Sequence, residues 1–141
     1  VEGLVFPPLL SHSLRMNLIE SALQLNPALI PNTPTVYILR LQSGGLYVGC
    51  TQNIISRLTA HDRGTASRTT RLDRAIMVLW LETHPSFTSA RQRETQLKKW
   101  SRPKKEALIQ ENWVELKQLS QSKVWTRHLP KVIVKQTVSQ L

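Results

Sequence analysis

Five side chains with the chemistry to cleave a phosphodiester occur in order within one stretch of the chain: Tyr37, Tyr47, Arg57, His61 and Glu94. An arginine guanidinium can bind a phosphate through two parallel hydrogen bonds, and an imidazole beside it can carry a proton. A carboxylate can ligate a divalent cation. Together, these residue types favour phosphodiester hydrolysis over a simple basic binding surface.

Glu94 is the candidate that the sequence places most firmly. Its expected helix has an apolar face, at intervals of three and four residues, made of Phe87, Ala90 and Leu97. Glu94 falls on this face, where a partly buried carboxylate needs a cation or a metal ion as its partner. Arg91 or Lys98, one turn away on either side, could instead neutralise it in an internal ion pair.

Arg57 and His61 are four residues apart, so they share one face of an expected helix. The pair could bind a scissile phosphate and move a proton, or it could simply face solvent on a basic helix. Spacing alone leaves both interpretations open.

Tyr37 and Tyr47 lie on the two arms of an expected β-hairpin, residues 36–41 and 46–50. An even loop over residues 42–45 would put the two tyrosines on opposite faces. An odd loop, with Gly44 or Gly45 forming a bulge, would put them on one face together with Leu39 and Leu41. Only the odd register lets both phenols enter one site, so we predict the odd loop.

The rest of the pattern predicts helices around this hairpin and one more strand. We expect an amphipathic helix over residues 9–25, a helix capped by Asn53, a basic loop over 63–74, a buried central strand over 75–81, and helices over about 86–100 and 102–109. A further helix follows Trp113, and residues 131–138 form an edge strand or a tail. The expected domains are an N-terminal helix and linker (1–34), a central domain (35–112) and a C-terminal extension (113–141).

The charge is concentrated where the candidate residues lie. The chain of 141 residues has a net charge of +10, and residues 57–105 hold twelve Lys and Arg against four Asp and Glu. A polyanion such as nucleic acid is the natural partner, because binding it releases condensed counterions. The residues expected to contact its backbone are Arg63, Arg68, Arg71, Arg74, Lys98, Lys99, Arg102, Lys104 and Lys105.

Cysteine content and hydropathy exclude other classes of protein. The single Cys50 excludes an internal disulfide framework and a multi-cysteine zinc site, and it suits a reducing, cytoplasmic location. The sequence has neither an apolar run long enough to span a bilayer nor a secretory signal pattern. The start at Val1 is compatible with a processed product or with a segment of a longer protein.

Taken together, Thr35-Val36-Tyr37, Tyr47-Val48-Gly49, Arg57, His61 and Glu94 resemble the GIY-YIG nuclease family. The likeness covers about residues 35–110, and the segment from Leu97 to Arg102 is closest to the small standalone bacterial members. Thr35 replaces the first glycine of the family pattern. Cys50 stands where another member of the family carries a lysine.

The resemblance implies an α+β fold, with a small, mainly three-stranded mixed sheet flanked by helices. It also implies a DNA endonuclease that uses one divalent metal, Mg²⁺ or Mn²⁺, held by Glu94. In this hypothesis Arg57 neutralises charge on the phosphoryl oxygens, Tyr47 or else His61 takes the proton of the attacking water, and Tyr37 helps to orient it. Cleavage would be structure-dependent or weakly sequence-specific, and RNA stays open as a substrate.

Two other interpretations fit the same residues. One is a non-catalytic nucleic-acid-binding module built on the same fold. The other is the nuclease part of a larger repair or mobile-element protein, in which residues 1–34 could contact a protein partner.

Overall fold

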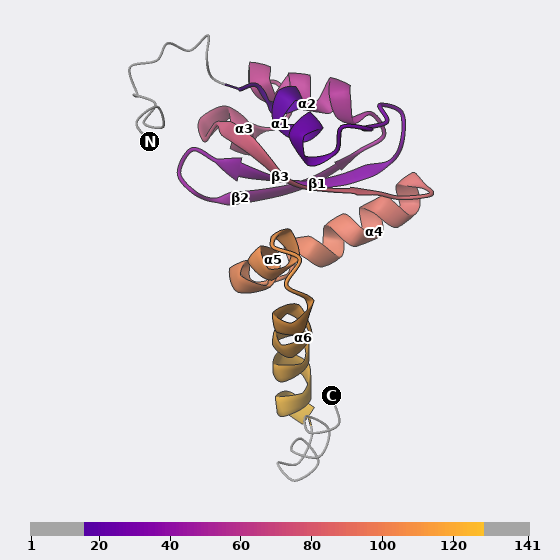
Figure 1. Ribbon diagram of the computed structural model, residues 1–141. Coiled ribbons are helices and arrows are strands. Elements are labelled where there is room, and N and C mark those ends of the chain that lie inside the picture. The colour runs from indigo at the N-terminus through magenta and orange to yellow at the C-terminus, as the bar shows by residue number, and fades with distance from the viewer. Residues whose placement is uncertain (1–15, 129–141) are drawn as a thin grey trace, which may run out of the picture. The chain divides into compact units, whose positions relative to one another are not determined.

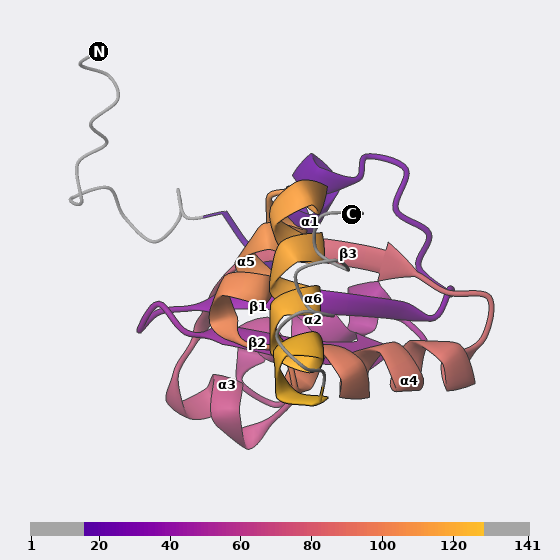
Figure 2. The ribbon, with the colours of Figure 1, turned by 90° about the horizontal axis from the view of Figure 1, so that it is seen from below.

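The computed structural model of this chain describes residues 16–128, with side chains to residue 121. Strands β1 (Thr35–Leu41), β2 (Leu46–Thr51) and β3 (Ala75–Thr83) form one sheet in the order β2-β1-β3. Figure 2 shows β1 between β3 and β2, while Figure 1 views the sheet close to edge-on. The expected α+β class and three-stranded sheet are confirmed. In one respect the sheet differs, because both pairings are antiparallel and the sheet is therefore not mixed.

The hairpin of β1 and β2 has the predicted odd loop. Tyr37 pairs with Gly49, and Leu39 pairs with Tyr47. The loop closes where the Leu41 N–H donates to the Gly45 carbonyl at 2.8 Å, which leaves residues 42–44 as the loop. Since side chains alternate along each strand, the two tyrosines lie on one face of the sheet.

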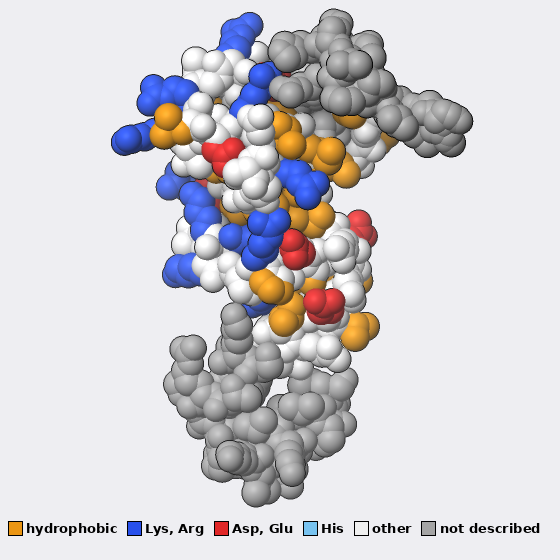
Figure 3. Space-filling view, turned by 90° about the vertical axis from the view of Figure 1, so that its left-hand side faces the viewer, with side chains coloured by type: hydrophobic (Ala, Val, Ile, Leu, Met, Phe, Trp, Pro, Cys, Tyr) orange, Lys and Arg blue, Asp and Glu red, His pale blue; other side chains and the backbone are white. Residues whose placement is uncertain are grey.

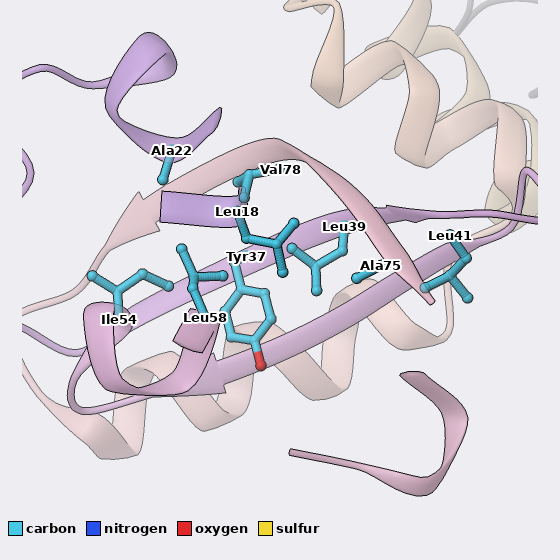
Figure 4. Close-up of a cluster of buried hydrophobic side chains, with 9 residues drawn as sticks. All are labelled: Leu18, Ala22, Tyr37, Leu39, Leu41, Ile54, Leu58, Ala75 and Val78. Atoms are coloured by element: carbon cyan, nitrogen blue, oxygen red, sulfur yellow. The ribbon is translucent and has the colours of Figure 1, made fainter. Parts of the chain in front are cut away.

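Helices α1 (Leu18–Leu25) and α2 (Ile54–Arg63) pack on the face of the sheet that carries the tyrosines. The buried cluster between them, drawn in Figure 4, consists of Leu18, Ala22, Tyr37, Leu39, Leu41, Ile54, Leu58, Ala75 and Val78. The N-terminal helix is thus part of the same core as the hairpin. It is also tied to β3 by polar contacts, because the Val78 N–H donates to Ser21 Oγ at 2.9 Å.

The first helix begins later than its apolar spacing predicts. Asn17 accepts a hydrogen bond from the Glu20 N–H, and the Glu20 carboxylate accepts one from the Asn17 N–H. This capping box fixes the start at Leu18. The prediction of helix at residues 16 and 17 is therefore wrong, and residues 9–15 lie outside the described part of the chain.

The basic segment 63–74 contains a short helix, α3 (Arg68–Leu72), that the sequence analysis treated as loop. Helix α2 ends at Gly64, whose φ of 75° suits glycine. Ser67 then caps α3 by accepting a hydrogen bond from the Thr70 N–H. Only residues 64–67 separate the two helices, and Gly64, Thr65 and Ser67 among them read as one loop in the sequence pattern, which hides the cap.

Strand β3 is an edge strand, so the prediction of a central strand is wrong. The apolar run at residues 75–81, which predicted a central strand, has another cause. Two register shifts against β1 insert extra residues, so that Ala75, Val78 and Leu81 lie opposite Leu41, Leu39 and Tyr37 at intervals of three instead of two. Apolar side chains are therefore needed at irregular positions, and the run loses the alternation of a half-buried strand.

The chain divides into two compact units between Gln96 and Leu97. Helix α4 (Phe87–Lys98) spans that boundary, and α5 (Arg102–Ile109) and α6 (Trp113–His128) belong to the second unit. Pro103 stands in the first turn of α5, where its missing N–H costs no helical hydrogen bond, as predicted. Residues 131–138 lie outside the described residues. No helix among residues 16–128 is long and apolar enough to cross a membrane.

Candidate active site

Three aromatic rings from three elements, β1, β2 and α2, meet on the α2 side of the hairpin. The Tyr37 hydroxyl lies 2.8 Å from His61 Nε2. The Tyr47 ring stands edge-on to the His61 ring with centroids 5.3 Å apart, and the two tyrosine rings have centroids 6.4 Å apart. The odd loop register brings both phenols to this place, and the helical position of His61 on α2 brings the imidazole between them.

Burial sets the protonation of Tyr37 and His61. Tyr37 has an exposed fraction of 0% and His61 of 1%, whereas Tyr47 is half-buried. Burial raises the pKa of Tyr37, and nearby Tyr47 adds to the rise, so this phenol stays neutral. Burial, and secondly the positive charge of Arg57, lowers the pKa of His61 to about 4, so its imidazole is neutral at physiological pH.

Gly49 makes room for the Tyr37 ring. A Cβ atom at Gly49 would lie 2.4 Å from the Tyr37 hydroxyl oxygen and 2.5 Å from Cζ. Tyr37 therefore extends across the neighbouring strand directly over this glycine, its pairing partner. In Figure 4 its ring lies among aliphatic side chains while its hydroxyl points away from them. Any side chain at this position would force the phenol to move.

His61 has a second polar partner that the sequence analysis missed. Its Nδ1 lies 2.9 Å from Thr70 Oγ1 on α3, and Thr70 is itself buried with an exposed fraction of 1%. Thr70 Oγ1 also lies 2.9 Å from Ser67 Oγ. The available sequence signal is Ser67 alone, because serine is a preferred N-cap residue and predicts a helix start before Thr70.

Glu94 approaches from α4, next to the strand residue that follows Gly49. The Cys50 thiol donates to Glu94 Oε1 at 3.3 Å, and Arg91 Nε lies 3.8 Å from the same oxygen. The Glu94 side chain has an exposed fraction of 15%, so the expected partly buried carboxylate is present. Cys50 points to the opposite face of the sheet from Tyr37 and Tyr47, so Glu94 stands on that face.

Arg57 and Glu94 both act electrostatically on Tyr37. Arg57 is half-buried and lies one turn before His61 on α2. Its charge opposes the rise of the Tyr37 pKa that burial and Tyr47 cause, while the negative charge of Glu94 adds to that rise. Both charged groups are thus close enough to act on the central phenol.

The expected nucleic-acid contacts divide between the two units. In the first unit Arg63, Arg68, Arg71 and Arg74 are exposed, and in the second Lys98, Lys99 and Arg102 are exposed while Lys104 and Lys105 are half-buried. Burial lowers the pKa of Lys105. Figure 3 shows many of the Lys and Arg side chains, in blue, exposed at the surface. A cavity of about 420 Å³ in the first unit is lined by Gly64, Thr65, Ser67, Arg68 and Arg71.

The donor set around Glu94 fits a hard divalent cation that keeps most of its water. Glu94 offers one partly exposed carboxylate. Among the described residues no group of three or more His, Cys, Asp and Glu side chains gathers as a metal cage. Proteins commonly bind Mg²⁺ through one or two carboxylates, and water and substrate oxygens are its other ligands. Two adjacent metal ions would need more carboxylates than this place provides.

Comparison with known proteins shows which family the chain resembles. The model of the GIY-YIG catalytic domain matches residues 33–107. A UPF0213 protein of Bacillus pumilus is 33% identical over 79 residues, which are 56% of this chain and 81% of the relative. A UPF0213 protein of Staphylococcus aureus is 32% identical over 76 residues, which are 54% of this chain and 93% of the relative.

A solved structure is similar as well. The solution NMR structure of a UPF0213 protein from Bacillus halodurans is 31% identical, with a TM-score of 0.39, and the match covers 55% of this chain and 83% of that one. The match to the catalytic-domain model contains both tyrosine tripeptides, Arg57, His61 and Glu94. The chain therefore belongs to the GIY-YIG family of nucleases.

Proposed function

We propose that this chain is a divalent-metal-dependent endonuclease that hydrolyses phosphodiester bonds in DNA. The observation that carries the proposal is the meeting of Tyr37, Tyr47 and His61 on one face of the hairpin, within the electrostatic reach of Arg57 and Glu94. A core that needed only aromatic bulk at these positions would not require a phenol, an imidazole, a guanidinium and a carboxylate together.

Different exposure suggests different roles for the three rings. Tyr47 is the accessible phenol, so it is the group that would give up its hydroxyl proton to solvent and, as the phenolate, take the proton from the attacking water. Tyr37 and His61 are almost fully buried and hold Tyr47 in place through ring contacts. The neutral His61 would be a poor match for phosphate, which supports its role behind Tyr47.

Arg57 and Glu94 would provide the charges. Arg57 would donate hydrogen bonds to the phosphoryl oxygens as negative charge builds up on them. Glu94 would hold Mg²⁺ or Mn²⁺, and a bound divalent cation supplies positive charge to the scissile phosphate and the leaving oxygen. The Cys50 thiol and Arg91 would hold the Glu94 carboxylate in position while it binds the cation.

The basic side chains in both units would contact the DNA backbone. Phosphate contacts position a nucleic acid without reading its sequence. Structure-dependent or weakly specific cleavage is therefore the expected behaviour, in keeping with the exposed arginines around the cavity near Ser67.

The test combines substrates with a matched pair of variants. The purified protein is incubated with branched, single-stranded and duplex DNA, and with an RNA of the same sequence, with Mg²⁺ or with EDTA. Glu94→Ala should abolish cleavage and retain DNA binding, whereas Glu111→Ala, on an exposed residue, should cleave like the unmodified protein. Full activity in the Glu94 variant would refute the proposal. Salt-sensitive binding by the unmodified protein, with no cleavage of any substrate, would instead identify a non-catalytic binding module.

A further inference from the structure

A row of hydrogen bonds leads from the buried tyrosine through α2 to α3. The Tyr37 hydroxyl is 2.8 Å from His61 Nε2, His61 Nδ1 is 2.9 Å from Thr70 Oγ1, and Thr70 Oγ1 is 2.9 Å from Ser67 Oγ. The first three groups are buried, and Ser67 lines the cavity of about 420 Å³ near Arg68. Each ring nitrogen of His61 thus has a buried hydrogen-bond partner, Tyr37 at Nε2 and Thr70 at Nδ1.

The chemistry of the end groups decides which way these hydrogen bonds run. A neutral imidazole carries one N–H and one acceptor nitrogen. A phenol is a much stronger acid than a neutral imidazole N–H, so the Tyr37 hydroxyl donates to Nε2. The proton of the imidazole must then be on Nδ1, where Thr70 Oγ1 accepts it. The Thr70 hydroxyl hydrogen is then free to point to Ser67, whose hydroxyl oxygen lies at 2.9 Å and whose carbonyl oxygen lies at 3.5 Å.

We propose that Thr70 is a positioning residue that holds His61 in the Nδ1–H tautomer, so that Nε2 accepts the hydroxyl hydrogen of Tyr37. Without an acceptor at this position, a buried Nδ1–H would lose its hydrogen-bond partner and gain no water in its place. The imidazole would then carry its proton on Nε2 and donate it to Tyr37. That exchange reverses the hydrogen bond to the phenol and changes how Tyr37 and His61 support Tyr47.

The catalytic consequence rests on the proposed nuclease function, but the tautomer can be measured without it. Long-range ¹H–¹⁵N NMR spectra distinguish the two neutral imidazole tautomers by the ¹⁵N shifts of the ring. His61→Gln removes the His61 signals and so assigns them among the four histidines of the chain. The unmodified protein should show His61 with its proton on Nδ1 at pH 7.

Three variants separate the role of Thr70 from a general packing effect. Thr70→Val keeps the shape but removes the acceptor, and His61 should shift to the Nε2–H tautomer. Thr70→Ser restores the hydroxyl and should restore Nδ1–H. Ser67→Ala removes the hydroxyl next to Thr70 together with the side-chain cap of α3, and it should leave the His61 tautomer unchanged in protein that keeps the amide signals of α3. Backbone amide spectra confirm that each variant is folded, and a folded Thr70→Ser variant tests the hydroxyl even where Thr70→Val fails to fold.

Activity provides the second readout. Thr70→Val should lower kcat roughly tenfold with little change in KM, as expected for a group that orients another, and Thr70→Ser should recover most of it. An Nε2–H tautomer in the unmodified protein, or an unchanged tautomer in folded Thr70→Val, would overturn the assignment of Thr70. A changed tautomer with unchanged cleavage would overturn its role in catalysis alone. A chain with no nuclease activity would still give the tautomer result.

Discussion

Tyr37 Oη and His61 Nε2 lie 2.8 Å apart inside the core, although 24 positions separate the two residues in the chain. The contact joins the central strand to α2 at the place where the rings of both residues face Tyr47. A polar contact this deep fixes the position of the strand relative to the helix. It also leaves Tyr47 as the phenol of the pair that water and substrate can reach.

Replacing each tyrosine by phenylalanine should distinguish the proton acceptor, Tyr47, from the residue that holds it in place, Tyr37. Tyr47→Phe should lower the cleavage rate by roughly 10²–10⁴-fold, because the accessible phenol is the proposed base. Tyr37→Phe should retain more activity but lower the free energy of unfolding by about 1–2 kcal/mol, since it leaves His61 Nε2 without its buried partner. Single-turnover cleavage and urea unfolding measure the two effects, and equal losses of activity in both variants would contradict the division of roles.

Gly49→Ala should disturb the site through packing alone. The new methyl group would overlap with the Tyr37 hydroxyl and Cζ, so Tyr37 or the strand must shift. We expect a loss of about 1–3 kcal/mol in the free energy of unfolding. Gly45→Ala is the matched control, because its nearest neighbours lie at 3.5 Å and 3.7 Å. Urea unfolding with the same loss in both variants would show that backbone freedom, and not contact with Tyr37, accounts for the effect.

Stability should depend on pH through His61. Its pKa is about 4 in the folded chain and about 6.5 when unfolded, so the unfolded chain binds more protons between these values. The contribution is therefore complete above pH 6.5 and decreases as the pH falls towards 4, by roughly 3 kcal/mol in all. Urea unfolding at pH 7, 5.5 and 4 measures it. His61→Gln should lose this part of the pH dependence, and an unchanged slope between pH 7 and 4 would refute the assignment.

The salt dependence of DNA binding should show whether Arg68 and Arg71, which line the cavity, contact phosphates. If Arg68 and Arg71 each contact a phosphate, replacing either by glutamine should reduce the slope of log Kd against log salt by about 1. Arg40→Gln is the control, because Arg40 is exposed but lies outside the expected contact set. Fluorescence anisotropy with one labelled duplex at several salt concentrations measures the slopes. Equal slopes for the unmodified protein and both cavity variants would place the DNA elsewhere.

The sequence predicts this site best where chemistry restricts geometry. The requirement that Tyr37 and Tyr47 share one site selected the odd hairpin register, and the structure has that register. The apolar neighbours of Glu94 on its helix likewise indicated a partly buried carboxylate. Side chains repeat every two residues along a strand and about every 3.6 residues along a helix. The spacing in the sequence therefore shows directly which side chains share a face.

The sequence predicts less where contacts join distant segments. The partnership of His61 with Thr70 depends on how α3 folds back towards α2, and no periodicity encodes it. The bulges of β3 conceal its edge position, because they remove the alternation from which burial on each face is read. The role of Gly49 under the Tyr37 ring also needed the strand pairing, which places the two residues directly opposite each other.

The hairpin loop also limits how this chain can vary in length. Gly44, with φ of 95°, is the residue at which the three-residue connection turns. Inserting or deleting a single residue between β1 and β2 would rotate every following β2 side chain to the other face, taking Tyr47 away from His61 and towards the side of Glu94. Changes of two residues preserve the faces. Active natural variants of this hairpin should therefore differ in loop length by even numbers, or carry a second bulge that restores the original parity.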